Sequence, residues 1–184
     1  MFVLYAIPIG ILVGYLLGGR LERLAALRLR WVPLILVGLA VQVAIFTDAG
    51  GRIAGEAGPA LYIASTAAVF IAVLRNMRVP GVALIAIGAG CNLAAILANG
   101  GWMPADGAAL GSVGGLGSGY TNSIVVADPA LPPLTDVFAL PAWLPLANVF
   151  SVGDVLIGIG VAATIALAMR GGETTRAPRP GHSP

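Results

Sequence analysis

The chain has 184 residues, of which 58% are apolar by type and 10% are charged, with a formal net charge of +2. A soluble domain usually carries about 25% charged and about 45–50% apolar residues, so the composition excludes a disordered chain and disfavours an ordinary cytosolic protein. The single cysteine, Cys91, excludes an intramolecular disulfide, and the single histidine, His182, excludes a zinc site built on histidine and cysteine. The ten basic residues are all arginines, scattered between long apolar stretches, a pattern that does not favour nucleic-acid binding.

Five apolar segments predict five membrane-spanning helices, because a helix needs about 20 apolar residues to cross the bilayer core. The segments are 2–18, 31–47, 59–74, 80–98 and 152–169, and the only charged side chain inside them is Asp154. The predicted fold class is therefore an all-α integral membrane protein. It forms a single membrane domain, 1–170, with a long extracytoplasmic loop, 99–151, between the fourth and fifth helices. The tail, 171–184, is rich in proline and glycine and is predicted to be disordered in the cytoplasm.

The distribution of arginines predicts the orientation, because loops kept in the cytoplasm are enriched in basic residues. With the N-terminus outside, nine arginines lie on the inner side and only Arg52 lies outside. The first segment then acts as an uncleaved anchor. The sequence predicts a protein of the cytoplasmic membrane, with its N-terminus outside and its C-terminus inside.

The first predicted helix carries two successive GxxxG steps, formed by Gly10, Gly14 and Gly18. This spacing lets helix backbones approach closely. It is typical either of packing against a neighbouring helix of the same chain, which we favour, or of a homodimer face.

The fourth predicted helix places Asn92 and Asn99, seven residues apart, on one face near its outer end. A polar side chain at this depth is costly unless it finds a partner. Hydrogen bonding between helices is one interpretation. The other is an outward-opening polar pocket, for which the nearby Trp102 is a further candidate.

The glycine-rich stretch 107–119 has six glycines in 13 residues. A phosphate-binding loop is disfavoured, because no GK[ST] follows. We interpret this stretch as a flexible lid or linker.

Two carboxylates stand near the predicted outer surface. Asp136 lies between apolar neighbours, and Asp154 opens the fifth helix three residues after Ser151. Two aspartates brought together share a proton, so that one acts as a base on water and the other as an acid, as in aspartic peptidases. The alternative is structural, because Ser151-x-x-Asp154 resembles a capping box and an acid there complements the helix dipole.

Three short motifs point to a known family: Asn99-Gly100-Gly101-x-Met103-Pro104, Leu134-Thr135-Asp136, and Ser-x-Gly-Asp at 151–154. In these motifs the chain resembles an uncharacterised family of small bacterial multi-pass membrane proteins, a domain of unknown function. The resemblance extends over most of the chain. The resemblance implies a bacterial inner-membrane protein and carries no known activity.

The C-terminal part also resembles the last two helices of bacterial lipoprotein signal peptidases. Those enzymes open their final helix with a pattern like FNxADxxIxxG, on which Phe150, Asp154, Ile157 and Gly160 fall in register. Their other catalytic aspartate lies about 18 residues earlier, as Asp136 does here, and Gly88, Ala89, Asn92 and Leu93 resemble their GN-containing motif. The resemblance implies that Asp136 and Asp154 are a catalytic pair.

Two hypotheses of function follow. The first is an outward-facing aspartyl hydrolase or peptidase that uses Asp136 and Asp154, with Asn92, Asn99 and Ser151 orienting the pair and its substrate. The second is a non-enzymatic accessory subunit, or a binder of a lipid or small molecule, that uses the same pocket. Expected partners are the bilayer and a membrane-embedded peptide, lipid or small ligand, and no cofactor, metal or nucleic acid is expected. Carboxyl oxygens within about 3–5 Å of one another would favour the first hypothesis.

Overall fold

The structure is a computed structural model that describes residues 2–113 and 123–171. The described chain is mostly helical and contains seven α-helices. They are α1 (Ala6–Leu16), α2 (Val32–Ile45), α3 (Asp48–Ala54), α4 (Gly58–Leu74), α5 (Val82–Ala98), α6 (Gly107–Ser112) and α7 (Val152–Arg170). Short 3₁₀ helices are η1 (Phe2–Tyr5), η2 (Leu21–Ala26), η3 (Gly55–Ala57) and η4 (Pro132–Leu134).

Each of the five predicted apolar segments contains an α-helix, with boundaries a few residues inside or beyond the predicted range. Two helical stretches are long and apolar enough to cross a membrane, namely Asp48–Leu74, which joins α3, η3 and α4, and α7. Three shorter apolar helices are Phe2–Leu16, Val32–Ile45 and Val82–Ala98. Only 22% and 33% of the apolar windows of the two long stretches are buried, which is unlike the mostly buried core helix of a soluble protein.

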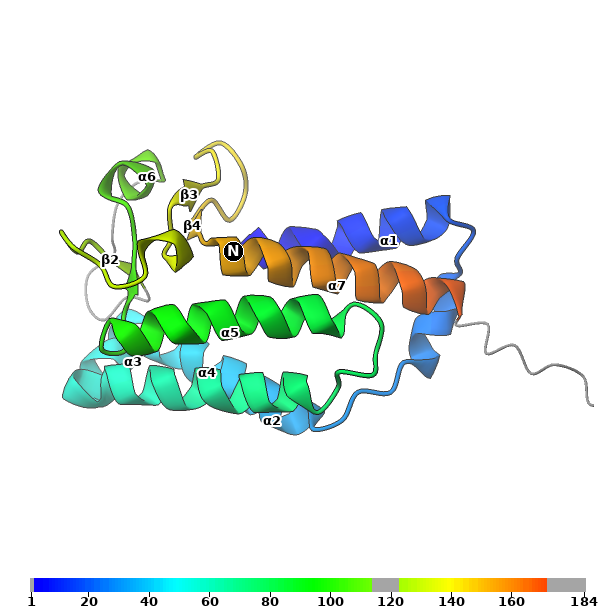
Figure 1. Cartoon of the computed structure of the whole chain (residues 1–184), viewed down its shortest axis with the longest axis horizontal. Helices are drawn as coiled ribbons and strands as arrows, with labels where there is room; N and C mark the ends of the chain where they lie inside the picture. Colours follow the sequence, from blue (N-terminus) through cyan, green and yellow to red (C-terminus); the bar gives the residue numbers. More distant parts are fainter. Residues whose placement is uncertain (1, 114–122, 172–184) are drawn as a thin grey trace, which may run out of the picture.

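The five apolar helices lie roughly along one axis (Figure 1). α7 packs between α1 and α5, α4 packs against α5, and α2 packs against α4. At one end of the bundle lie η2 and the turn between α4 and α5, and at the other end lie α3, α6 and the four strands (Figure 1). We call these the η2 end and the strand end.

Glycines set the close approach of the helices that contact α7. A Cβ on Gly10 would lie 2.8 Å from the carbonyl oxygen of Ala162, and one on Gly14 would lie 2.5 Å from the sulfur of Met169. Two of the three glycines of the GxxxG steps, Gly10 and Gly14, therefore pack against α7 within the chain. Gly18 has no atom within 4 Å of its Cβ position and a φ of +75°, so it serves the chain reversal after α1.

The long segment between α5 and α7, predicted to be a loop, is folded in its described parts. β1 (Met103–Pro104) pairs in parallel with β2 (Ser123–Ile124), and β3 (Phe138–Ala139) pairs antiparallel with β4 (Val149–Phe150). α6 occupies the start of the glycine-rich stretch, because the Asp106 side chain caps it by accepting from the Ala109 N–H at 2.8 Å. We call the described residues 99–113 and 123–151 the strand-end cap. Residues 114–122 of the predicted lid or linker, and 172–184 of the predicted tail, lie outside the described residues.

The Asn99-Gly100-Gly101 motif ends α5. Gly100 and Gly101 have φ values of +67° and +91°, and the Gly101 N–H donates to the Ile96 carbonyl at 2.8 Å. Glycine is favoured at such a left-handed helix end. A Cβ on Gly101 would also lie 2.5 Å from Cβ of Pro59, so this motif brings the end of α5 against the start of α4.

Candidate functional site at the start of α7

Asp154 belongs to a capping box that begins α7. The Ser151 hydroxyl accepts from the Asp154 N–H at 3.1 Å, and Asp154 Oδ2 accepts from the Ser151 N–H at 3.1 Å. The first backbone N–H groups of a helix have no acceptor within the helix. Here the side chain of each residue accepts a hydrogen bond from the backbone N–H of the other. The capping interpretation of Ser151-x-x-Asp154 is therefore confirmed.

Asn92 of α5 joins this box across the helix interface. The Ser151 hydroxyl donates to Asn92 Oδ1 at 2.8 Å, with Asp154 Oδ2 as a second acceptor at 3.2 Å, and Asn92 Nδ2 donates to Asp154 Oδ1 at 2.9 Å. Ser151 is fully buried, and Asn92 and Asp154 are partly buried. Both carboxylate oxygens of Asp154 thus accept hydrogen bonds in a closed ring, which we call the Asn92–Ser151–Asp154 network.

Two glycines allow this network to form. A Cβ on Gly153 would lie 1.9 Å from Asn92 Oδ1, and a Cβ on Gly88 would lie 2.3 Å from the Gly153 carbonyl oxygen. Only helices without side chains at these two positions can approach closely enough for an asparagine on one helix to bond to the cap of the other. The network therefore fixes how α5 and α7 cross at their strand-end termini.

Asp136 lies in the strand-end cap and is 3% exposed. Its N–H donates to the Pro104 carbonyl at 2.9 Å, and its carbonyl accepts from the Asp106 N–H at 3.0 Å. The turn η4 just before it packs against both α5 and α7. The structure thus buries Asp136 in a segment that contacts the two helices of the network, while the convergence of the two carboxylates stays a prediction.

Asn99 and Trp102 connect the cap to the helices. Asn99 Nδ2 donates to the Ala95 and Ala130 carbonyls at 2.8 and 2.9 Å, and its Oδ1 accepts from the Ala130 N–H at 2.9 Å. Trp102 is half-buried against a cluster formed by Ile45, Tyr62, Ala95, Ile96 and Met103. The Asn99 side chain is therefore used to bind the cap, not to extend the network around Asn92.

Two cavities beside α7 were not predicted. One is an apolar groove of about 410 Å³ between α1 and α7, which we call the α1–α7 groove. The other is a cavity of about 960 Å³ at the η2 end, which we call the η2-end cavity. The sequence signal for the groove was the run of small residues on α7, because Gly158, Ala162 and Ala163 leave room where larger side chains would fill it. Within the described residues, no group of three or more His, Cys, Asp or Glu side chains could hold a metal ion.

The fold and the network define a class of mostly helical protein with an apolar exterior and a small folded cap at one end. The sequence places the chain in a protein family of unknown function, DUF5317, which it matches over residues 26–166. This match spans α2 to the second half of α7 and includes the whole network. No curated protein and no solved structure matches the chain.

Proposed function

We propose that the chain is an integral protein of the bacterial cytoplasmic membrane with five spanning segments. Its exterior supports this, because each of the five apolar helices exposes large apolar side chains, among them Leu12, Leu36, Ile71, Ile87 and Ile159. Contiguous exposed apolar surface on this scale is unusual for a soluble monomer. α2 has only 14 residues, about 21 Å, and its span would be completed by the flanking Trp31 and Phe46 at headgroup depth.

We propose an orientation with the N-terminus outside and the η2 end in the cytoplasm. Seven described arginines belong to segments at the η2 end, whereas Arg52 lies in α3 at the strand end; the seven are Arg20, Arg23, Arg28, Arg30, Arg75, Arg78 and Arg170. Basic residues are retained on the cytoplasmic side.

Reporter fusions test this orientation. A reporter fused after Gly171 is expected to be active only as a cytoplasmic enzyme, and one inserted at Gly115 only as an exported enzyme. An exported reporter at Gly171, or a cytoplasmic one at Gly115, would contradict the orientation. Alkaline carbonate extraction of the same fusions checks membrane integration separately.

The activity best supported by the geometry is non-enzymatic binding of a hydrocarbon chain, as in a lipid or fatty acid, in the α1–α7 groove. The observation that carries this proposal is the groove's almost wholly apolar lining, which includes the small residues Ala6, Gly158, Ala162 and Ala163 and the aromatic residues Phe2 and Tyr5. Its volume of about 410 Å³ falls within the range of about 300–1,000 Å³ typical of small-molecule sites. The charged group of the network, the Asp154 carboxylate, already accepts hydrogen bonds on both of its oxygens.

Filling the groove tests the proposal. Ala163→Leu is expected to weaken binding of an environment-sensitive fluorescent fatty acid to the purified protein at least tenfold, because the added carbon atoms occupy the groove. Ala40→Leu, on the exposed surface of α2, is the matched control and should bind like the wild type. Absence of saturable binding in the wild type, or equal binding by Ala163→Leu, would overturn this activity.

An aspartyl hydrolase remains the second candidate, and one observation favours it. Asp136 is a nearly fully buried carboxylate in a segment whose preceding turn touches α5 and α7. This candidate requires Asp136 to approach Asp154, and catalytic distances often tighten only when substrate binds. The Asp154 variants described in the Discussion distinguish this candidate from the first.

A further inference from the structure

The η2-end cavity has an amphipathic lining. It lies between the segment after α1, η2, the turn before α5 and the end of α7, and its volume is about 960 Å³. Among the lining residues are the large apolar Leu17, Leu27, Val79 and Leu167 and the two arginines Arg23 and Arg170. Within the bundle it lies at the end where the arginines gather.

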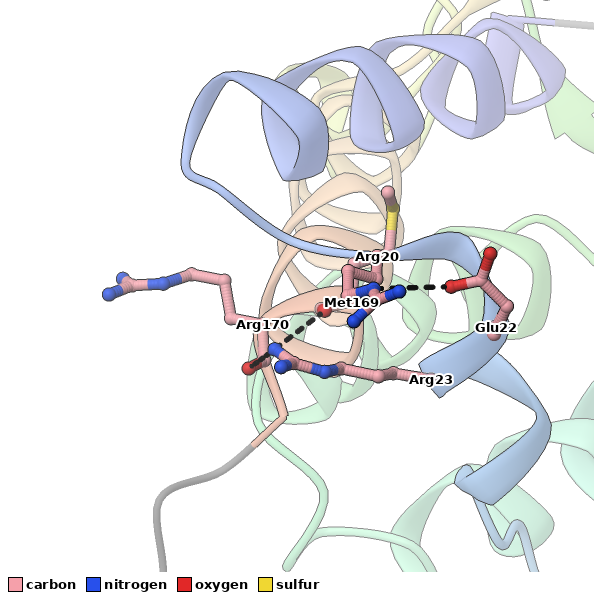
Figure 2. Close-up of polar contacts among 5 residues, drawn as sticks. All are labelled: Arg20, Glu22, Arg23, Met169 and Arg170. Carbon is pink, nitrogen blue, oxygen red and sulfur yellow. Dashed lines mark hydrogen bonds and ion pairs between the residues drawn. The ribbon is translucent and has the colours of Figure 1, made fainter.

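Arg23 is held at the cavity by the C-terminus of α7. Its Nη1 donates to the carbonyl of Arg170 and lies 3.5 Å from the carbonyl of Met169, and Figure 2 shows the guanidinium beneath the last turn of the helix. A cation at this position satisfies helix-terminal carbonyls and complements the helix dipole. A guanidinium carries five N–H donors, and the two carbonyls engage only Nη1. Arg23 is thus oriented with donors to spare.

The positive charge at the cavity is not neutralised by acids in the described part of the chain. Glu22 is paired with Arg20 at 3.6 Å, and both side chains are exposed (Figure 2). The Arg170 guanidinium points away from this pair, and no hydrogen bond or ion pair to a described residue engages it (Figure 2). The Arg170 guanidinium also points away from that of Arg23 (Figure 2), and Arg170 is an exposed residue at the edge of the cavity. The cavity therefore has one oriented guanidinium, that of Arg23, beside an apolar wall, and a second one that reaches the same anion by a change of side-chain rotamer.

We propose that the η2-end cavity binds an anionic phospholipid of the inner leaflet. The phosphate would accept from Arg23 and Arg170, and an acyl chain would lie along Leu17, Leu27 and Leu167. Guanidinium donors match phosphate oxygens geometrically, and basic pockets between helices on the cytoplasmic side suit anionic headgroups. A free phosphate would use the arginines alone and would leave the apolar wall uncovered. The inference rests on the proposed membrane location and orientation, and it is independent of the α1–α7 groove.

The test uses the full-length protein in nanodiscs of phosphatidylcholine with a small fraction of phosphatidylglycerol, followed by native mass spectrometry of the lipids retained after ejection. The wild type is expected to retain phosphatidylglycerol over phosphatidylcholine. Arg170→Gln should reduce this retention about tenfold, the loss expected when one hydrogen bond between charged groups is removed from the site. Arg75→Gln, which removes an exposed arginine at the same end but outside the cavity, should leave it unchanged.

Further variants separate the outcomes. Ala168→Phe, which fills the cavity without changing charge, should also reduce retention, and 10 mM inorganic phosphate should not compete. If Arg75→Gln and Arg170→Gln lose phosphatidylglycerol retention equally, the retention comes from general surface charge, and this outcome would overturn the site. Competition by phosphate would assign the arginines to a free anion and overturn the lipid. Carbonate extraction of the wild type is scored separately, so failure of the membrane proposal is distinguishable from failure of the lipid site.

Discussion

Replacing Gly153 with alanine is expected to destabilise the protein by about 3 kcal/mol, the upper end of the usual cost of overpacking. The added Cβ would lie 1.9 Å from Asn92 Oδ1 and 2.7 Å from the Gly88 carbonyl oxygen. The carbonyl is backbone, and the Asn92 side chain is held by Asp154 and Ser151, so neither can move aside without breaking hydrogen bonds. Gly88→Ala should have a similar effect, because its Cβ would lie 2.3 Å from the Gly153 carbonyl oxygen.

The matched control for this prediction is Gly90→Ala, two residues further along α5. A Cβ there would lie 3.5 Å from the nearest ring carbon of Phe70, which is ordinary van der Waals contact. Unfolding of the three variants by denaturant in detergent micelles compares them directly. If Gly153→Ala and Gly90→Ala unfold at the same denaturant concentration, α5 and α7 do not cross as the structure has them.

Much of the helical framework could be predicted from the sequence, because uninterrupted apolar runs leave few alternatives to a helix. α3 was missed because its sequence holds two glycines and two charges, and it forms through the local cap of Thr47, whose hydroxyl accepts from the Gly50 N–H at 3.0 Å. The two-residue strands were also missed, since pairing so short depends on contacts between distant segments and leaves no alternation in the sequence.

The candidate site was predicted only in part, for a related reason. The capping box is local and could be read from Ser151 and Asp154. The shared helix face of Asn92 and Asn99 suggested one pocket, yet their partners are different: Asp154 lies 62 residues from Asn92, and Ala130 lies 31 residues from Asn99. A helix face indicates which residues point the same way, but tertiary packing decides which partner each one meets. Likewise, nothing in the sequence indicates that the Arg23 side chain contacts the carbonyls at the end of α7, because Arg23 and Met169 are 146 residues apart.

Asp154→Asn is expected to leave stability nearly unchanged, whereas Asp154→Ala should cost about 2–3 kcal/mol. In the wild type, Asp154 accepts from Asn92 and Ser151. An asparagine at 154 places an NH₂ opposite the NH₂ of Asn92, but rotation of the Asn92 amide by 180° restores every bond: Asn92 then accepts from residue 154 and donates to the Ser151 hydroxyl, whose proton turns to the remaining oxygen at 154. Alanine leaves the Asn92 amide and the Ser151 N–H without acceptors, and each such buried donor costs about 1–3 kcal/mol.

A double-mutant cycle with Asn92→Ala checks this account. If the two residues act through one network, the double variant should be only slightly less stable than Asp154→Ala alone. The loss of stability in the double variant should therefore be smaller than the sum of the losses in the two single variants. Strictly additive effects, or a loss for Asp154→Asn equal to that for Asp154→Ala, would contradict the ring of hydrogen bonds.

Asp154→Asn also distinguishes the two proposed functions, because this variant should keep its stability under both but should lose activity only if the protein is a hydrolase. For a hydrocarbon-binding protein, Asp154→Asn should bind the fluorescent fatty acid like the wild type, since the amide preserves the cap and the groove lies elsewhere on α7. For an aspartyl hydrolase, a carboxyl group is needed to exchange a proton with water, so Asp154→Asn and Asp136→Asn should each fold normally and yet accumulate the same uncleaved membrane precursors as a deletion strain. Comparative proteomics of the membranes measures this. Normal binding together with an unchanged membrane proteome assigns Asp154 to the helix cap, and shared precursors in both variants assign it to catalysis.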